Sequence, residues 1–180
     1  MTLKVSFEIG DRDLKRFRAE MRRARQSVRD ADESDILEAA QATLADLERE
    51  DLPDFIAQRI PQLENLLAMV HDEDWKIGKA GRDKVLAVLV YFSDPDDLIP
   101  DLIPGLGLID DAVMIELVIR DLKHDLEAYL DFCHYRQTYF KRHKIGRDAV
   151  TRGRRLKTKR TQLEARAARR KKRDQRSHIV

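Results

Sequence analysis

Apolar residues recur every three or four positions through most of the chain, a pattern typical of amphipathic α-helices. The first such segment predicts a helix over residues 11–29, with Asp11 as its N-cap. The second predicts a helix from about Asp32 to Arg49. The apolar positions of the first are Leu14, Phe17, Met21 and Val28, and those of the second are Ile36, Leu37, Ala40, Leu44 and Leu47. Each set falls near one helical face, so both helices are expected to pack on a common core.

A third apolar segment runs from Phe55 to Val70, with Pro61 inside it. Proline removes a backbone N–H donor and clashes with the preceding turn, so Pro61 is expected to kink this helix or to split it in two. Residues His71–Gly81 then hold Trp75 and two glycines, which indicates a turn with Trp75 as a core residue.

The segment Lys84–Phe92 is apolar on nearly all sides and is therefore expected to be a buried helix. A long helix is predicted from Asp111 to about Phe140, apolar all round over Ala112–Ile119 except for Glu116. Beyond that only a stripe is apolar, formed by Leu122, Leu126, Tyr129, Leu130 and Cys133. This helix should enter the core at its start and leave it later. Glu116 and Arg120 are four residues apart and are expected to pair on its surface.

The two ends of the chain lack this periodicity. Leu3–Ile9 alternates apolar and polar residues, and without a second strand beside it this segment is expected to be an extended arm. After Phe140, Ala149, Leu156 and Leu163 fall seven apart, and one apolar residue per heptad is too thin for a packed seam.

The whole pattern predicts an all-α protein. Residues 1–140 should form a compact bundle of five or six helices with a short extended N-terminal arm, and residues 141–180 a basic, flexible or helical C-terminal tail. Hydrophobic residues make up 42% of the 180 residues, which is enough for a core. Seven Gly and five Pro are few for an all-β fold, which needs many turns.

Three features predict a cytoplasmic protein without a transmembrane segment. The single cysteine, Cys133, cannot form an intramolecular disulfide and suits a reducing compartment. Lys4 and Glu8 lie within the first ten residues, so a cleaved signal is not expected. The longest apolar run, Val85–Phe92, falls well short of the about 20 residues that a bilayer-spanning helix needs.

Charge is divided unequally along the chain. Residues 141–180 carry 17 Lys or Arg against three acidic residues, a net +14, whereas residues 1–140 carry 18 basic and 30 acidic side chains, a net −12. This division predicts a polyanion partner for the tail, or docking of the tail on its own acidic body. The tail has no aromatic residue for base stacking, so RNA or DNA would be bound through phosphates and independently of sequence. The candidate polyanion-binding residues are Arg152, Arg154, Arg155, Lys157, Lys159, Arg160, Arg169, Arg170, Lys171, Lys172 and Arg173.

The segment Tyr91–Asp111 is both acidic and apolar. Its carboxylates can accept backbone N–H groups in tight turns, and Asp110 or Asp111 is predicted to cap the long helix. Its prolines should stiffen a linker whose leucines and isoleucines reach the core. The positions that define this motif are Tyr91, Pro95, Asp97, Ile99, Pro100, Asp101, Pro104, Gly107, Asp110 and Asp111.

The motif resembles the signature of the YkvA-like family, domain of unknown function 1232, over roughly residues 84–122. The resemblance implies a small helical bacterial domain with no established activity. Some relatives carry membrane-associated segments, and this chain differs from them in lacking an apolar run of spanning length.

The same acidic segment leaves a second function open, a metal-binding protein or metal-dependent enzyme. The candidate ligands are Asp94, Asp97, Asp101, Asp110 and Asp111. An EF-hand is excluded, because Ile99 and Gly105 stand where its loop needs Gly and Glu. No nucleophile stands at a telling spacing, so the sequence favours a non-enzymatic interaction module without a cofactor. Peripheral attachment of the tail to anionic lipid is a further alternative that uses the same charges.

Overall fold

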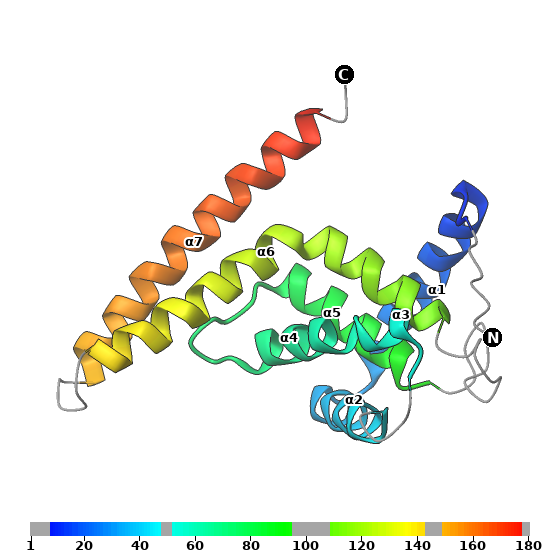
Figure 1. Ribbon diagram of the computed structural model, residues 1–180, viewed down its shortest axis with the longest axis horizontal. Coiled ribbons are helices and arrows are strands. Elements are labelled where there is room, and N and C mark those ends of the chain that lie inside the picture. Colours follow the sequence, from blue (N-terminus) through cyan, green and yellow to red (C-terminus); the bar gives the residue numbers. More distant parts are fainter. Residues whose placement is uncertain (1–7, 48–51, 95–108, 143–148, 178–180) are drawn as a thin grey trace.

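The computed structural model describes residues 8–47, 52–94, 109–142 and 149–177, and every regular element within them is a helix. The helices are α1 (Asp11–Asp30), α2 (Glu33–Leu47), α3 (Asp54–Ala57), α4 (Ile60–His71), α5 (Lys79–Phe92), α6 (Ile109–Arg142) and α7 (Ala149–Ser177). The predicted all-α class is confirmed (Figure 1). Most of the predicted N-terminal arm, residues 1–7, lies outside the described residues.

Helix α5 is the centre of the core, because α1, α2, α4 and α6 all pack against it. All side chains from Val85 to Leu89 are buried, as the apolar run predicted. The helix begins at Lys79, five residues earlier than Lys84, with Gly78 as its N-cap. The predicted turn after α4 is correspondingly shorter.

Pro61 splits the third predicted helix into α3 and α4, which confirms one of the two expected outcomes. Proline is tolerated there because it lies in the first turn of α4, where its N–H would have no helical partner. The backbone N–H of Leu63 donates to the carbonyl of Arg59 at 3.0 Å, so helical bonding resumes directly after the break.

The start of α1 differs by one residue from the prediction. Gly10 is the N-cap, and its carbonyl accepts the N–H of Leu14 at 3.0 Å. Asp11 therefore lies inside the first turn. Asp13 accepts the backbone N–H of Gly10 at 3.1 Å through Oδ2, which satisfies a donor at the helix start.

Helix α6 enters the core at its start and leaves it towards its end, as predicted. Met114, Ile115 and Val118 are buried in its first turns. Of the predicted stripe, however, Leu130 is 43% exposed. The expected pair within α6 is also wrong: Glu116 forms an ion pair with Arg59 of the α3–α4 connection, at 3.6 Å.

Helix α7 packs along α6 (Figure 1). Leu156, Leu163 and Ala167 are buried in this contact and join the main core cluster. The tail is thus helical, one of the two predicted forms. The expectation that the tail cannot pack is wrong, because Ala167 adds a third buried residue to Leu156 and Leu163. Ion pairs between α7 and α6 lie on either side of this apolar contact.

Candidate functional site

The two ends of the acidic motif meet where α5 ends and α6 begins. Tyr91 Oη donates a hydrogen bond to Asp110 Oδ2 at 2.8 Å, and both side chains are buried. Asp110 and Asp111 are 0% and 2% exposed, although both are acidic. They lie in the first turn of α6, where the unpaired N–H groups of a helix stabilise negative charge. Because α6 begins at Ile109, both carboxylates lie inside its first turn, and neither occupies the N-cap position that the sequence predicted.

The middle of the motif cannot be placed. Residues 95–108 lie outside the described residues, and they include Pro95, Asp97, Ile99, Pro100, Asp101, Pro104 and Gly107. Within the ranges that the structure describes, no three His, Cys, Asp or Glu side chains are grouped so that they could hold a metal ion. Two of the five candidate metal ligands, Asp97 and Asp101, fall outside those ranges, so the metal site stays a prediction.

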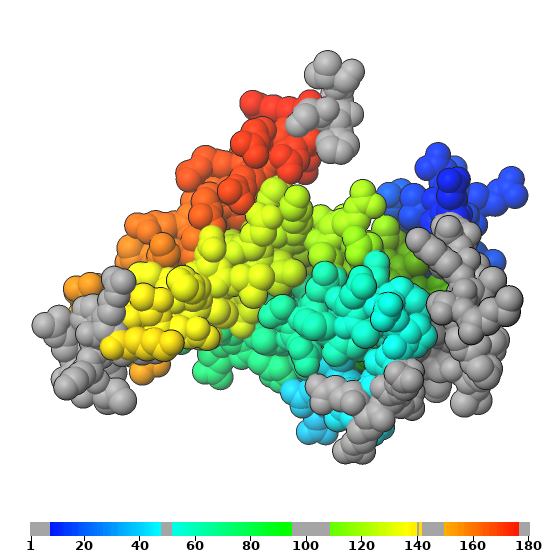
Figure 2. Space-filling view, viewed as in Figure 1, coloured from blue at the N-terminus to red at the C-terminus, as the bar shows by residue number. Residues whose placement is uncertain are grey.

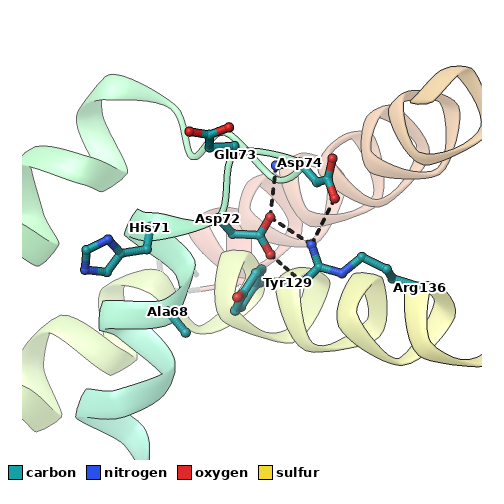
Figure 3. Close-up of a pocket in the computed structure, with 7 residues that line it drawn as sticks. All are labelled: Ala68, His71, Asp72, Glu73, Asp74, Tyr129 and Arg136. Atoms are coloured by element: carbon teal, nitrogen blue, oxygen red, sulfur yellow. Dashed lines mark hydrogen bonds and ion pairs between the residues drawn. The ribbon is translucent and has the colours of Figure 1, made fainter. Parts of the chain in front are cut away.

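An ionic cluster that the sequence analysis missed fixes the turn after α4 (Figure 3). Asp72 Oδ1 accepts the backbone N–H groups of Asp74 and Trp75, at 3.0 and 3.1 Å, and a hydrogen bond from Arg136 Nη1 at 3.0 Å. Arg136 Nη2 lies 2.7 Å from Asp72 Oδ2 in an ion pair, and Nη1 also reaches Asp74 Oδ2 at 3.2 Å. Arg136 comes from α6, 64 residues away, so this cluster ties the turn to the long helix.

The environment of this cluster keeps its groups in fixed protonation states. Burial acts to raise the pKa of Asp72, but hydrogen bonds from Arg136 and from the N–H of Trp75 outweigh it, so the pKa is lowered. The hydrogen bond to Asp72 raises the pKa of Arg136. Burial, with Cys133 and Asp72 nearby, raises the pKa of the Tyr129 phenol, which therefore stays protonated.

A shallow pocket of about 490 Å³ opens beside this cluster, lined by Ala68, His71, Asp72, Glu73, Asp74, Tyr129 and Arg136. Its arginine is neutralised by two carboxylates, and its phenol is held protonated. The ring of Trp75 packs against Tyr129 of this lining and against Phe132, with centroid distances of 5.6 and 5.4 Å. These contacts form a structural clamp for the turn.

Nine of the eleven predicted basic residues of the tail divide between two faces of α7. The inner face lies against α6 and the turn. There Arg170 pairs with Glu127 at 2.7 Å, Lys171 pairs with Asp125, and Arg160 Nη1 donates to the carbonyl of Asp74 at 3.2 Å.

Two further inner-face cations lie over aromatic rings of α6. The Lys159 ammonium is 5.0 Å from the Tyr135 centroid, and the Arg155 guanidinium is 5.7 Å from that of Tyr139. Arg166 was not among the predicted residues, and it pairs with Asp131. Docking of the tail on its own acidic body was one of the two outcomes predicted from the charge division. The ion pairs and cation–π contacts with α6 are the physical basis of this docking.

The opposite face of α7 is exposed and basic. Arg154, Lys157, Arg169 and Lys172 are predicted residues that lie on it, and Arg176 extends the row. At about 100° per residue these five fall within roughly 120° of one another around the helix. None of them forms an ion pair within the described part of the chain. We call these five residues the outer stripe.

The last two predicted residues belong to neither group. Arg152 is exposed near the start of α7, and Arg173 lies beside Asp174, with Nε 3.7 Å from its carboxylate. Asp174 in turn accepts from His124 Nε2 of α6 at 2.7 Å, and this hydrogen bond lowers the pKa of the Asp174 carboxyl.

Comparison with known proteins identifies the acidic motif region. Residues 84–117 match the family described as "Protein of unknown function (DUF1232)". The chain is also similar to the protein of Bacillus subtilis (strain 168) named "Uncharacterized membrane protein YkvA", with 39% identity over 62 residues. That similarity covers 31% of this chain and 58% of the relative's length. No solved structure matches the chain significantly. In the described part of the chain, no helix combines the length and apolarity that a bilayer crossing requires.

Proposed function

Starting from the YkvA-like DUF1232 resemblance of this chain, we propose that it is a non-enzymatic interaction module that binds RNA or DNA through the outer stripe of α7. The observation that carries the proposal is the division of α7 into two basic faces. Three cations of the inner face pair with carboxylates of α6, whereas the five cations of the outer stripe have no ion-pair partner among the described residues. Unpaired cations in a row are suited to a polyanion.

The dimensions of the outer stripe fit a phosphate backbone. From Arg154 to Arg176 the helix rises by about 33 Å, at about 1.5 Å per residue. Duplex DNA presents one negative charge per about 1.7 Å of its axis, so the duplex offers more phosphates than the stripe has cations. Five neutralised phosphates correspond to a slope of about −4.5 for log K against log salt on duplex, and about −3.5 on single strands.

Sequence preference should be slight. The described part of α7 contains no aromatic residue, and the residues between the two halves of the stripe are Thr158, Thr161, Ala165 and Ala168. These side chains neither stack on bases nor present the forked donors that recognise base edges. Binding therefore would depend on charge and would fall steeply as salt rises.

The test compares the native chain with a stripe variant in fluorescence-anisotropy titrations against short RNA and DNA at several salt concentrations. The stripe variant is Arg154→Gln, Lys157→Gln, Arg169→Gln, Lys172→Gln and Arg176→Gln. A control removes the same charge elsewhere, by Lys76→Gln, Lys79→Gln, Arg120→Gln, Lys123→Gln and Lys141→Gln. The stripe variant should lose most of the binding and most of the salt slope, and the control should keep both. Equal losses in the two variants would contradict the proposal.

A second candidate is an anionic membrane surface, because the Bacillus subtilis relative is named a membrane protein. Val150, which is 64% exposed, is the one large apolar residue of α7 on the face of the outer stripe, so attachment would be mainly electrostatic, at about 1 kcal/mol per cation near the surface. Co-sedimentation with phosphatidylserine vesicles separates the two. Binding to vesicles without binding to RNA or DNA would show that the ligand of the outer stripe is an anionic membrane and not a nucleic acid.

A further inference from the structure

Helix α1 presents a second basic surface, which the overall charge of residues 1–140 conceals. Its 20 residues contain eight Lys or Arg and four Asp or Glu. Met21 and Ala24 are buried, with Phe17 and Val28 packed beside them, so one face of α1 is held by the core. Helix α5 is the main neighbour of α1 in this contact.

The face of α1 opposite the core carries cations. At about 100° per residue, Arg12, Lys15, Arg16 and Arg22 fall within roughly 120° of one another and away from Met21. All four are exposed, and none forms an ion pair within the described ranges. Arg23 lies beside them and differs, because it pairs with Glu20 at 2.8 Å.

The two basic helices flank an acidic body. Residues 31–140 hold nine basic and 25 acidic side chains, a net −16. Helix α1 lies at one end of the molecule, and α7 runs from the other end back over α6, so that the start of α1 and the end of α7 rise on the same side of α6 (Figure 1). The outline between them is concave over α6 (Figure 2).

We infer that the exposed face of α1 is a second contact for the same nucleic acid that binds the outer stripe. The inference rests on the proposed function of α7 and extends it from one contact to two. A nucleic acid long enough to reach both helices would gain affinity, because the second contact forms at a high effective concentration once the first is made. The acidic body between them would repel phosphates, so contact should be concentrated at the two helices.

Ligand length provides the test. A hairpin-closed duplex of about 10 base pairs is about 34 Å long and matches the outer stripe alone, whereas about 40 base pairs span about 136 Å. On the short duplex the native chain should show a salt slope of about −4 to −5. On the long duplex nine cations can act, and the slope should approach −8. Salt slopes that do not depend on length would overturn the inference.

Variants assign the difference to α1. In the α1 variant, Arg12, Lys15, Arg16 and Arg22 are each replaced by Gln, a good helix former. On the long duplex this variant should bind at least about 10-fold more weakly than the native chain and return to the slope of the short duplex. An all-Lys version of the same four positions should retain native binding. If the stripe variant loses binding and the α1 variant does not, the inference fails and the proposed function stands. If neither variant changes binding, both fail.

Lysine protection in the native chain tests the same contact without a substitution. Acetylation of Lys15, Lys157 and Lys172 can be followed by mass spectrometry with and without saturating long duplex. All three lysines should be protected, whereas Lys79, which pairs with Asp83, should react at an unchanged rate. Full reactivity of Lys15 alongside protection of Lys157 and Lys172 would exclude α1 from the contact.

Discussion

Replacing Asp72 with Asn should measure what the ionic cluster contributes to folding. Asn keeps a carbonyl oxygen that can accept the N–H groups of Asp74 and Trp75, and it removes the charge that pairs with Arg136. The Asp72 side chain is only 6% exposed, whereas that of Arg136 is 26% exposed. A hydrogen bond to a charged group contributes about 1.5–3 kcal/mol, and partial exposure of Arg136 favours the lower half of that range. The expected loss is about 2 kcal/mol in the free energy of unfolding.

The assay is urea unfolding followed by far-UV circular dichroism at pH 7. Asp74→Asn is the matched control, because Asp74 contacts the same guanidinium with a side chain that is 41% exposed. Its cost should stay below about 1 kcal/mol. If Asp72→Asn and Asp74→Asn cost the same within error, burial does not distinguish the two carboxylates and the explanation fails.

The difference in unfolding free energy between the native chain and Asp72→Asn should depend on pH. The folded-state pKa of Asp72 is lowered, so its charge stabilises the native chain above the unfolded-state pKa of about 3.9. This stabilisation is lost as the pH falls through the lower, folded-state pKa. The stability difference between the native chain and Asp72→Asn should therefore be constant from pH 7 to about 5 and narrow below about 4. A difference that disappears between pH 7 and 5 would contradict this assignment.

Three further outcomes are expected. Tyr91→Phe should cost about 1–3 kcal/mol in the same urea assay, because it removes a hydrogen bond to a buried carboxylate. Tyr135→Phe, at a partly exposed site, should cost less than about 1 kcal/mol. Leu163→Ala should cost about 2–3 kcal/mol and speed tryptic cleavage within α7, whereas Val150→Ala, at a residue 64% exposed, should leave cleavage unchanged. Equal cleavage rates for these two variants would refute the docking of α7. Residues 1–140 should fold without the tail, because α7 packs mainly on α6, and a truncated chain without a cooperative transition would refute that boundary.

The helices of the body could be predicted because their apolar periodicity is strong and local. The five apolar residues predicted for α2 are all buried. Pro61 interrupts the third predicted helix because proline lacks the backbone N–H that a continuous helix needs. The start of α5 was missed because Lys79–Asp83 is polar and carries no apolar signal. Its capping residue, Gly78, looked like part of a turn.

The docking of α7 and the Asp72 cluster depend on pairing between distant segments, which periodicity does not encode. Arg136 and Asp72 are 64 residues apart, and each alone is an ordinary charged residue of a helix or turn. The basic face of α1 was missed for a different reason. Its net charge was averaged with the acidic residues that follow it, and a count per predicted helix would have revealed it.

Trp75 is the single tryptophan of the chain, and its position makes it an internal optical reporter. It follows Asp74, whose carbonyl accepts Arg160 of α7, and its ring contacts Tyr129 and Phe132 of α6. Indole emission responds to the polarity around the ring, and a tyrosine at this distance transfers excitation to it. Separation of α7 from the turn should therefore shift the emission spectrum of the unlabelled protein. Whether a bound partner leaves α7 docked can be followed in real time by this fluorescence.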